Sequence, residues 1–152
     1  MDGTGMRTPP AIVGLGIVSA AGIGADETLE AIRANQPRLR DVPEYAEGPY
    51  MTSRVGALPE GAWERLGCEG SSRVYAAADA AVRQAIAQAA PQLKDIPADR
   101  IGLVLSTTKA EVAALDAFVA GTPASENASR HILASEVAAN LMASNHFGGP
   151  VP

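Results

Sequence analysis

Two short apolar segments, residues 11–18 and 101–105, contrast with the more polar chain around them. Both consist of Val, Ile, Leu, Ala and Gly and carry no charged side chain. A nearly continuous apolar run of this length is typical of a strand that is covered on both faces, as in a parallel sheet. A weaker strand is predicted over residues 51–58, which Pro59 would end.

Apolar residues at helical spacing occupy the stretches between these strands. The spacing predicts helices over residues 25–35, 60–66, 72–89, 109–119 and 134–144. This order of strands and helices predicts an α/β domain with a mostly parallel sheet. Two or three strands are few for so many helices, and apolar strands need neighbours on both edges. Because the chain reaches a Gly-Gly-Pro turn where a further strand would be expected, the pattern predicts an incomplete domain.

The helix over residues 72–89 has the strongest pattern. Ser72 offers an N-cap hydroxyl, and Asp79 with Arg83 forms a pair of opposite charge four residues apart. Pro91 is expected to end the helix. Its apolar residues recur three and four positions apart, which predicts a buried face formed by Val74, Ala77, Ala78, Ala81, Val82 and Ile86.

The composition of the 152 residues is typical of one globular domain and argues against some classes of binding partner. Apolar residues make up 47% of the chain, and the net charge of −5 comes without any run of basic residues, which argues against nucleic-acid binding. No apolar stretch reaches the roughly 18 residues of a membrane span. The start of the sequence lacks an apolar leader, so we expect a cytoplasmic protein.

Glycines and isolated reactive residues offer candidate chemistry that the surrounding sequence does not support. Gly14 and Gly16 invite comparison with a dinucleotide-binding loop, but Ser19 stands where that motif has its third glycine, so structural glycines are favoured. The single cysteine, Cys68, excludes a disulfide within the chain and lies beside an acidic residue that opposes thiolate formation. His131 and His146 lack metal-ligand spacing, and His146 follows a helix end that it could cap. We interpret all three as structural.

The polar cluster that follows the strand at residues 101–105 is the best candidate site. Thr107, Thr108 and Lys109 stand at the carboxyl end of this strand, where open α/β sheets bind their ligands. Hydroxyl groups here could equally cap the next helix. A lysine in the first turn of a helix is unfavourable with the helix dipole, which hints at a role for Lys109. These three residues are our candidate substrate-binding set.

Four segments taken together resemble the β-ketoacyl-acyl-carrier-protein synthases. Residues 12–24 resemble the opening strand and glycine turn of that family, and residues 72–89 its next helix. Residues 100–107 resemble its Arg-Ile-Gly strand, and residues 134–150 its helix and Phe-Gly turn before the nucleophile strand. The order and spacing cover nearly the whole chain. Departures occur at residues 19–21, where the family has a proline, and at 109–111, where it has glycines.

The resemblance implies a partial thiolase-like α/β layered domain, with residues 1–152 as its amino-terminal part. It also implies an acyltransferase reaction, decarboxylative Claisen condensation on carrier-protein thioesters, in fatty-acid or polyketide-type synthesis. Acyl groups would arrive on the phosphopantetheine of an acyl carrier protein, with no metal or diffusible cofactor. The expected partners are that carrier protein and the rest of the synthase or a homologous subunit in a dimer.

The family's catalytic residues have no counterpart in residues 1–152. In that family a nucleophilic cysteine follows the strand after the Phe-Gly turn, and two histidines act with it. We therefore predict that the chain alone is inactive and assign no catalytic residue. The short length fits a fragment, one polypeptide of a split synthase, or a non-catalytic partner subunit. A small-molecule binding module of another class is the remaining alternative.

Overall fold

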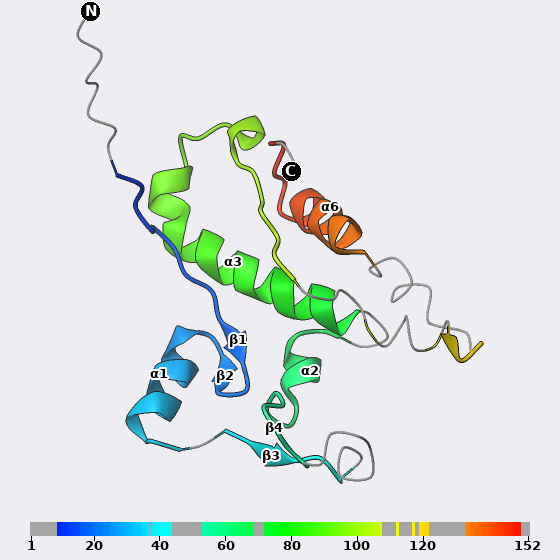
Figure 1. The fold of residues 1–152 in the computed structure, drawn as a ribbon. Coiled ribbons are helices and arrows are strands. Elements are labelled where there is room, and N and C mark those ends of the chain that lie inside the picture. The colour runs from blue at the N-terminus through cyan, green and yellow to red at the C-terminus, as the bar shows by residue number, and fades with distance from the viewer. Residues whose placement is uncertain are drawn as a thin grey trace, which may run out of the picture.

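The longest helix, α3 (Arg73–Leu93), runs through the middle of the computed structural model (Figure 1). The structure describes residues 9–36, 38–43, 53–68, 72–107, 112, 117, 119–121 and 133–149. An extended segment, residues 11–17, crosses α3, and a second helix, α6 (Ala134–Ser144), packs beside it. The other elements are β1 (Val18–Ser19), β2 (Gly22–Ile23), α1 (Ala25–Arg33), β3 (Arg40–Asp41), β4 (Arg54–Val55), α2 (Ala62–Arg65) and a 3-10 helix (Ala98–Arg100).

Helix α3 begins where the sequence predicts and ends later. Buried Ser72 is the N-cap, and its Oγ accepts a hydrogen bond from the backbone N–H of Tyr75 at 3.1 Å. The prediction that Pro91 ends the helix was wrong. In the last turn a proline removes only one intrahelical bond, and the backbone continues helical until the N–H of Lys94 bonds to the carbonyl of Ala90 at 3.2 Å. None of the described helices is long and apolar enough to cross a membrane.

The described strands form two small antiparallel sheets. Strands β1 and β2 pair Val18 with Ile23, and β3 and β4 pair Arg40 with Val55. The mostly parallel sheet is therefore not confirmed in the described part of the chain. The predicted strand over residues 11–18 enters a ladder only at its end, and residues 101–107 are extended without one, although both segments run in the same general direction in Figure 1.

The buried side chains of the described residues are small or aliphatic and concentrate where α3 meets α6. Helix α6, which agrees with the predicted range, contributes Val137, Ala138, Leu141 and Met142, and α3 contributes Ala76 and Ala89. The predicted apolar face of α3 is only half-buried. Because α3 is contacted by the amino-terminal segment as well as by α6, its periodicity alone does not identify the residues that become fully buried.

Gly14 and Gly16 allow the amino-terminal segment to lie directly on α3. A Cβ atom on Gly16 would overlap the carbonyl oxygen of Ala81, and one on Gly14 would overlap that of Ala85. Glutamine side chains of the helix accept hydrogen bonds from the backbone amides that follow each glycine: Leu15 N–H donates to Gln88 Oε1 at 2.6 Å, and Ile17 N–H donates to Gln84 Oε1 at 2.9 Å. The structural interpretation of the two glycines is confirmed.

Candidate functional site

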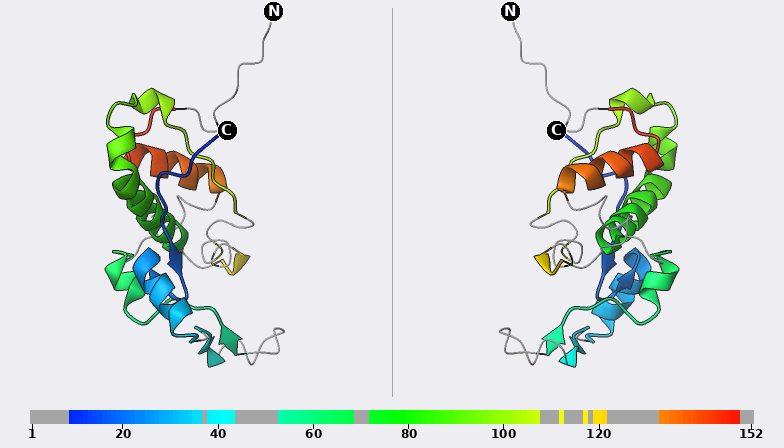
Figure 2. Two further views of the ribbon diagram at one scale, coloured as in Figure 1. Left: turned by 90° about the vertical axis from the view of Figure 1, so that its left-hand side faces the viewer. Right: turned by 90° about the vertical axis from the view of Figure 1, so that its right-hand side faces the viewer.

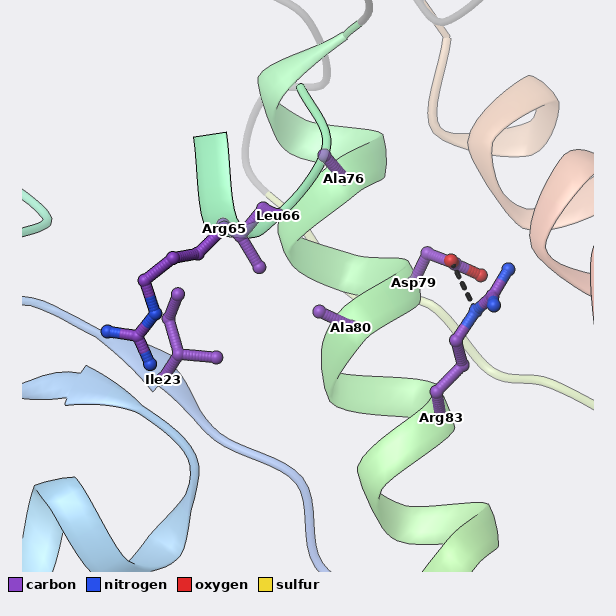
Figure 3. Close-up of a pocket in the computed structure, with 7 residues that line it drawn as sticks. All are labelled: Ile23, Arg65, Leu66, Ala76, Asp79, Ala80 and Arg83. Carbon is purple, nitrogen blue, oxygen red and sulfur yellow. Dashed lines mark hydrogen bonds and ion pairs between the residues drawn. The ribbon is translucent and has the colours of Figure 1, made fainter. Parts of the chain in front are cut away.

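A shallow pocket of about 340 Å³ lies between the β1–β2 hairpin, α2 and α3 (Figure 3). Alanines of α3 form its floor, and an arginine stands at each end, Arg65 beside Ile23 and Arg83 beyond Asp79. Its volume is at the lower end of the range of small-molecule sites. The lining residues are Ile23, Arg65, Leu66, Ala76, Asp79, Ala80 and Arg83.

Arg65 is held at the pocket by Glu27, which lies in the first turn of α1. Its Nη2 donates to Glu27 Oε1, and its Nη1 lies 3.4 Å from Glu27 Oε2. The same Oε2 accepts the backbone N–H of Ile23 at 2.9 Å. The hydrogen bond from Arg65 is the largest cause that lowers the pKa of Glu27, and the hydrogen bond from the backbone of Ile23 is the next. The same contact with Glu27 raises the pKa of Arg65. The Glu27 carboxylate therefore links the β1–β2 hairpin, α1 and α2. Figure 2 shows these elements from two further sides.

Replacing Glu27 by Gln is expected to lower the stability of the protein modestly near pH 7. Because the folded state lowers the pKa of Glu27 below its ordinary value of 4.5, this contribution is fully present above that value and is lost as the pH falls through the folded pKa. Urea unfolding at pH 7 and at an acidic pH should therefore show a stability difference between the wild type and Glu27→Gln at pH 7 that narrows at the acidic pH.

Glu30→Gln is the matched control for this measurement. Glu30 lies on the same helix, one turn later, and its side chain has no partner among the described residues. It should unfold like the wild type at both pH values. If the two variants lose equal stability at pH 7, the Glu27 contacts do not contribute and the assignment is wrong.

Asp79 at the other end of the pocket joins α3 to α6. Its Oδ2 accepts Arg83 Nε at 2.7 Å, which confirms the predicted pair four residues apart. Its Oδ1 accepts Asn145 Nδ2 at 3.0 Å and Ser144 Oγ at 3.3 Å. Asn145 Nδ2 also donates to the carbonyl of Leu141 at 2.9 Å and caps the end of α6. In Figure 3, Asp79 and Arg83 lie on the side of α3 that faces α6.

The pocket offers binding groups: an apolar floor bordered by two guanidinium groups. Each guanidinium group is already paired with a carboxylate, Arg65 with Glu27 and Arg83 with Asp79, so an anionic ligand would have to compete with these carboxylates for an arginine. Within the part of the chain that the structure describes, no three His, Cys, Asp or Glu side chains are placed to hold one metal ion together.

The structure does not bring the predicted site residues to this pocket. Thr107 is exposed at the end of the segment that follows the 3-10 helix, and Thr108 and Lys109 lie outside the described residues, as does His131. Cys68 is half-buried in the loop after α2, where its backbone N–H bonds to the carbonyl of Trp63 at 2.9 Å. His146 is exposed just after α6, in a left-handed conformation with φ of 58°.

Sequence reasoning missed Arg65, Glu27 and the α6 partners of Asp79. Glu27 has the pattern of a favourable charge in the first turn of a helix, and Arg65 lies 38 residues away from it in sequence. Ser144 and Asn145 are 65 and 66 residues from Asp79. Only the charge pattern of α3 gave a local signal, and it identified the Asp79–Arg83 pair alone.

No protein-family model matches the sequence, and no curated protein matches it. Among solved structures, that of "The ishigamide ketosynthase/chain length factor" is similar to this chain. The likeness covers 93% of this chain with a TM-score of 0.71 and 19% sequence identity. The chain has a ketosynthase-type fold. It spans 38% of the length of that protein.

The ketosynthase-type fold confirms the coarser part of the prediction from sequence. A thiolase-like, ketosynthase-type fold was expected from four segments in order, and the structural likeness in fold extends over 93% of the chain. The finer expectation of a mostly parallel sheet is not confirmed, because both described sheets are antiparallel and two-stranded.

Proposed function

We propose that residues 1–152 form the amino-terminal part of a β-ketoacyl-acyl-carrier-protein synthase-type protein that acts in polyketide-type or fatty-acid synthesis. The observation that carries the proposal is the likeness to a ketosynthase/chain length factor over 93% of the chain. The order of the four sequence segments supports it independently, because they span both ends of the chain. A cytoplasmic setting belongs to the same proposal.

In the complete protein the reaction would be a decarboxylative condensation. The malonyl group on the carrier loses carbon dioxide, and its α-carbon forms a bond to the carbonyl carbon of the enzyme-bound acyl thioester. The carbon–sulfur bond of that thioester breaks, and the cysteine leaves as a thiolate. The cysteine and the two histidines for this step have no match in residues 1–152. This part of the protein would therefore help to shape the acyl and carrier-protein surfaces, with no cofactor of its own.

A non-catalytic partner subunit is the second candidate function. It is favoured by the likeness to a protein whose name joins a chain length factor to a ketosynthase. In this form the chain would belong to a protein that pairs with a homologous catalytic ketosynthase subunit. Restoration of condensation by mixing the chain with such a subunit would distinguish this role from that of a fragment.

Lys109 is expected to strengthen binding of an acyl carrier protein, with Thr107 and Thr108 beside it. A carrier protein presents an acidic surface and a phosphopantetheine phosphate, and one charge pair across a binding surface changes affinity by about 2- to 5-fold. Lys109→Ala should weaken binding of phosphopantetheine-bearing carrier protein by that factor in a calorimetric or anisotropy titration, and more so at low salt.

Lys94→Ala is the control, because Lys94 is the other lysine of the chain and is exposed after α3 near Asp95. It should leave the affinity unchanged. If both variants weaken carrier-protein binding equally, the effect comes from the net charge of the chain and not from the position of Lys109. Formation of β-ketoacyl product by the isolated chain from acyl- and malonyl-loaded carrier protein, followed by mass spectrometry, would contradict the absence of catalytic positions.

The pocket of Figure 3 provides the observation that favours a small-molecule binding module instead. On this alternative, a short fatty acid such as octanoate would bind saturably to the chain, and Arg65→Gln or Arg83→Gln would weaken it. Binding of carrier protein would then be absent. The two titrations together separate this alternative from the synthase proposal.

A further inference from the structure

The one-turn helix α2 forms one wall of the pocket, to which Arg65 and the next residue, Leu66, contribute. Among the described residues, the backbone hydrogen bonds of residues 59–68 join this segment to itself and reach no other element. A single helical turn is not stable in water by its own hydrogen bonds. The position of α2 therefore depends on its side-chain contacts.

Glycines in the left-handed conformation flank α2. Gly61 has φ of 70° directly before the helix, and Gly67 has φ of 66° just after it. Gly67 closes the helix, because its N–H bonds to the carbonyl of Glu64 at 3.0 Å. A Cβ atom on Gly61 would meet only a side-chain oxygen of Glu64, at 4.0 Å, so glycine is needed there for its backbone conformation and not for space. Gly61 is therefore the residue at which the direction of the segment can change.

Two side-chain contacts hold α2 against its neighbours. Arg65 pairs with Glu27 of α1, and the two side chains are 51% and 39% exposed. Arg73, the first residue of α3, lies over the ring of Trp63, with its guanidinium carbon 5.2 Å from the ring centre. Contacts of these kinds are each weak at exposed positions. Within α2 only Ala62 is buried, and its side chain is a single methyl group.

We propose that α2 is a lid on the pocket, which opens by turning about Gly61 and is latched by the pairing of Glu27 with Arg65. Opening carries Arg65 and Leu66 away from the alanines of α3 and exposes the pocket floor. A segment held by few buried contacts opens locally at a lower free energy than the whole chain unfolds. The lid is a property of the described pocket and does not rest on the proposed synthase function.

Thiol labelling of the pocket floor tests the lid. Ala76 lines the pocket near Leu66 and is only 7% exposed, so a cysteine at this position should react with an aromatic disulfide reagent when α2 moves away (Figure 3). The measurement uses Ala76→Cys in a chain whose single cysteine, Cys68, is replaced by Ser. Adding Arg65→Gln releases the latch and should raise the labelling rate by about 2- to 5-fold, the effect of losing one exposed ion pair.

Ala89→Cys is the matched control on the same helix. Ala89 is 5% exposed and does not line the pocket; it lies under the amino-terminal segment, where a Cβ atom on Gly14 would be 3.0 Å from its side chain. Arg65→Gln should leave its labelling rate unchanged. Equal acceleration at both cysteines would mean a general loss of stability, and no acceleration at Ala76→Cys would mean that the ion pair is not a latch. Either result would overturn the proposal.

Amide exchange provides a second measurement that needs no introduced cysteine. The N–H groups of Arg65, Leu66 and Gly67 bond within the lid, so they should exchange faster than those in the middle of α3. Arg65→Gln should accelerate the exchange of Leu66 and Gly67 by the same factor as the labelling. Arg83→Gln, which changes the arginine at the other end of the pocket, should not. If the lid amides exchange as slowly as those of α3, α2 does not open separately and the proposal is wrong.

Discussion

Replacing Gly16 by Ala should lower the free energy of unfolding by about 1 to 3 kcal/mol, the usual cost of forcing an extra methyl group into a packed contact. The new Cβ would overlap the backbone carbonyl oxygen of Ala81. Helix backbone cannot turn aside as a flexible side chain can, so the segment itself would have to lift from α3. The hydrogen bond from Ile17 N–H to Gln84 would then be lost as well.

Gly56→Ala provides the control for this substitution. A Cβ atom on Gly56 would meet only the side chain of Ala20, at an ordinary 3.6 Å. Because alanine restricts the unfolded chain more than glycine does, this variant should be unchanged or slightly more stable. Urea unfolding followed by far-ultraviolet circular dichroism would compare the two. Equal stabilities for both variants would show that the segment does not pack on α3 as described.

The helices could be predicted from sequence because their signals are local. Ser72 caps α3 through a hydrogen bond to a residue three positions later, and α6 shows its buried face in the spacing of its own apolar residues. The end of α3 could not be predicted from Pro91. A proline removes one backbone hydrogen bond of a helix. In the last turn, as at Pro91 of α3, the helix can continue without that bond, and whether it does depends on contacts that the local sequence does not show.

The strands could not be predicted in the same way, because a ladder depends on a partner. Residues 11–17 have the composition of a buried strand, yet Gln84 and Gln88 take the bonds on one edge and the other edge remains open in the described structure. In the sequence these glutamines resemble the solvent-facing side of a helix. Val104, in the second apolar segment, is 82% exposed for the same reason: apolar character does not itself supply a neighbour.

The candidate site shows the same division between local and distant signals. The Asp79–Arg83 pair follows from helical spacing, whereas the pairing of Glu27 with Arg65 depends on how α1 and α2 meet. The candidate residues Thr107, Thr108 and Lys109 came from a general rule about the ends of parallel strands. Thr107 does not line the described pocket, and the role of this set stays a prediction.

Replacing Asp79 by Ala is expected to lower the free energy of unfolding by about 1.5 to 3 kcal/mol, the range for loss of hydrogen bonds to a charged group. The carboxylate is only 15% exposed and accepts hydrogen bonds from Arg83, Ser144 and Asn145. Two of these donors belong to the end of α6 and the residue after it. Their loss should loosen α6 from α3, which hydrogen exchange of α6 amides would show as faster exchange.

Two further variants separate the contact with α6 from the ion pair on the surface. Arg83→Ala removes a mostly exposed partner and should cost less than about 0.5 kcal/mol, since exposed pairs contribute little. Asp79→Asn keeps the shape and one acceptor oxygen but loses the charge, so its stability should lie between the other two. Because Ser144 and Asn145 also bond to the carbonyl of Leu141, α6 should remain helical in every variant. If Arg83→Ala proves as costly as Asp79→Ala, the stabilisation comes from the ion pair on α3, and the contact between α3 and α6 is mainly apolar.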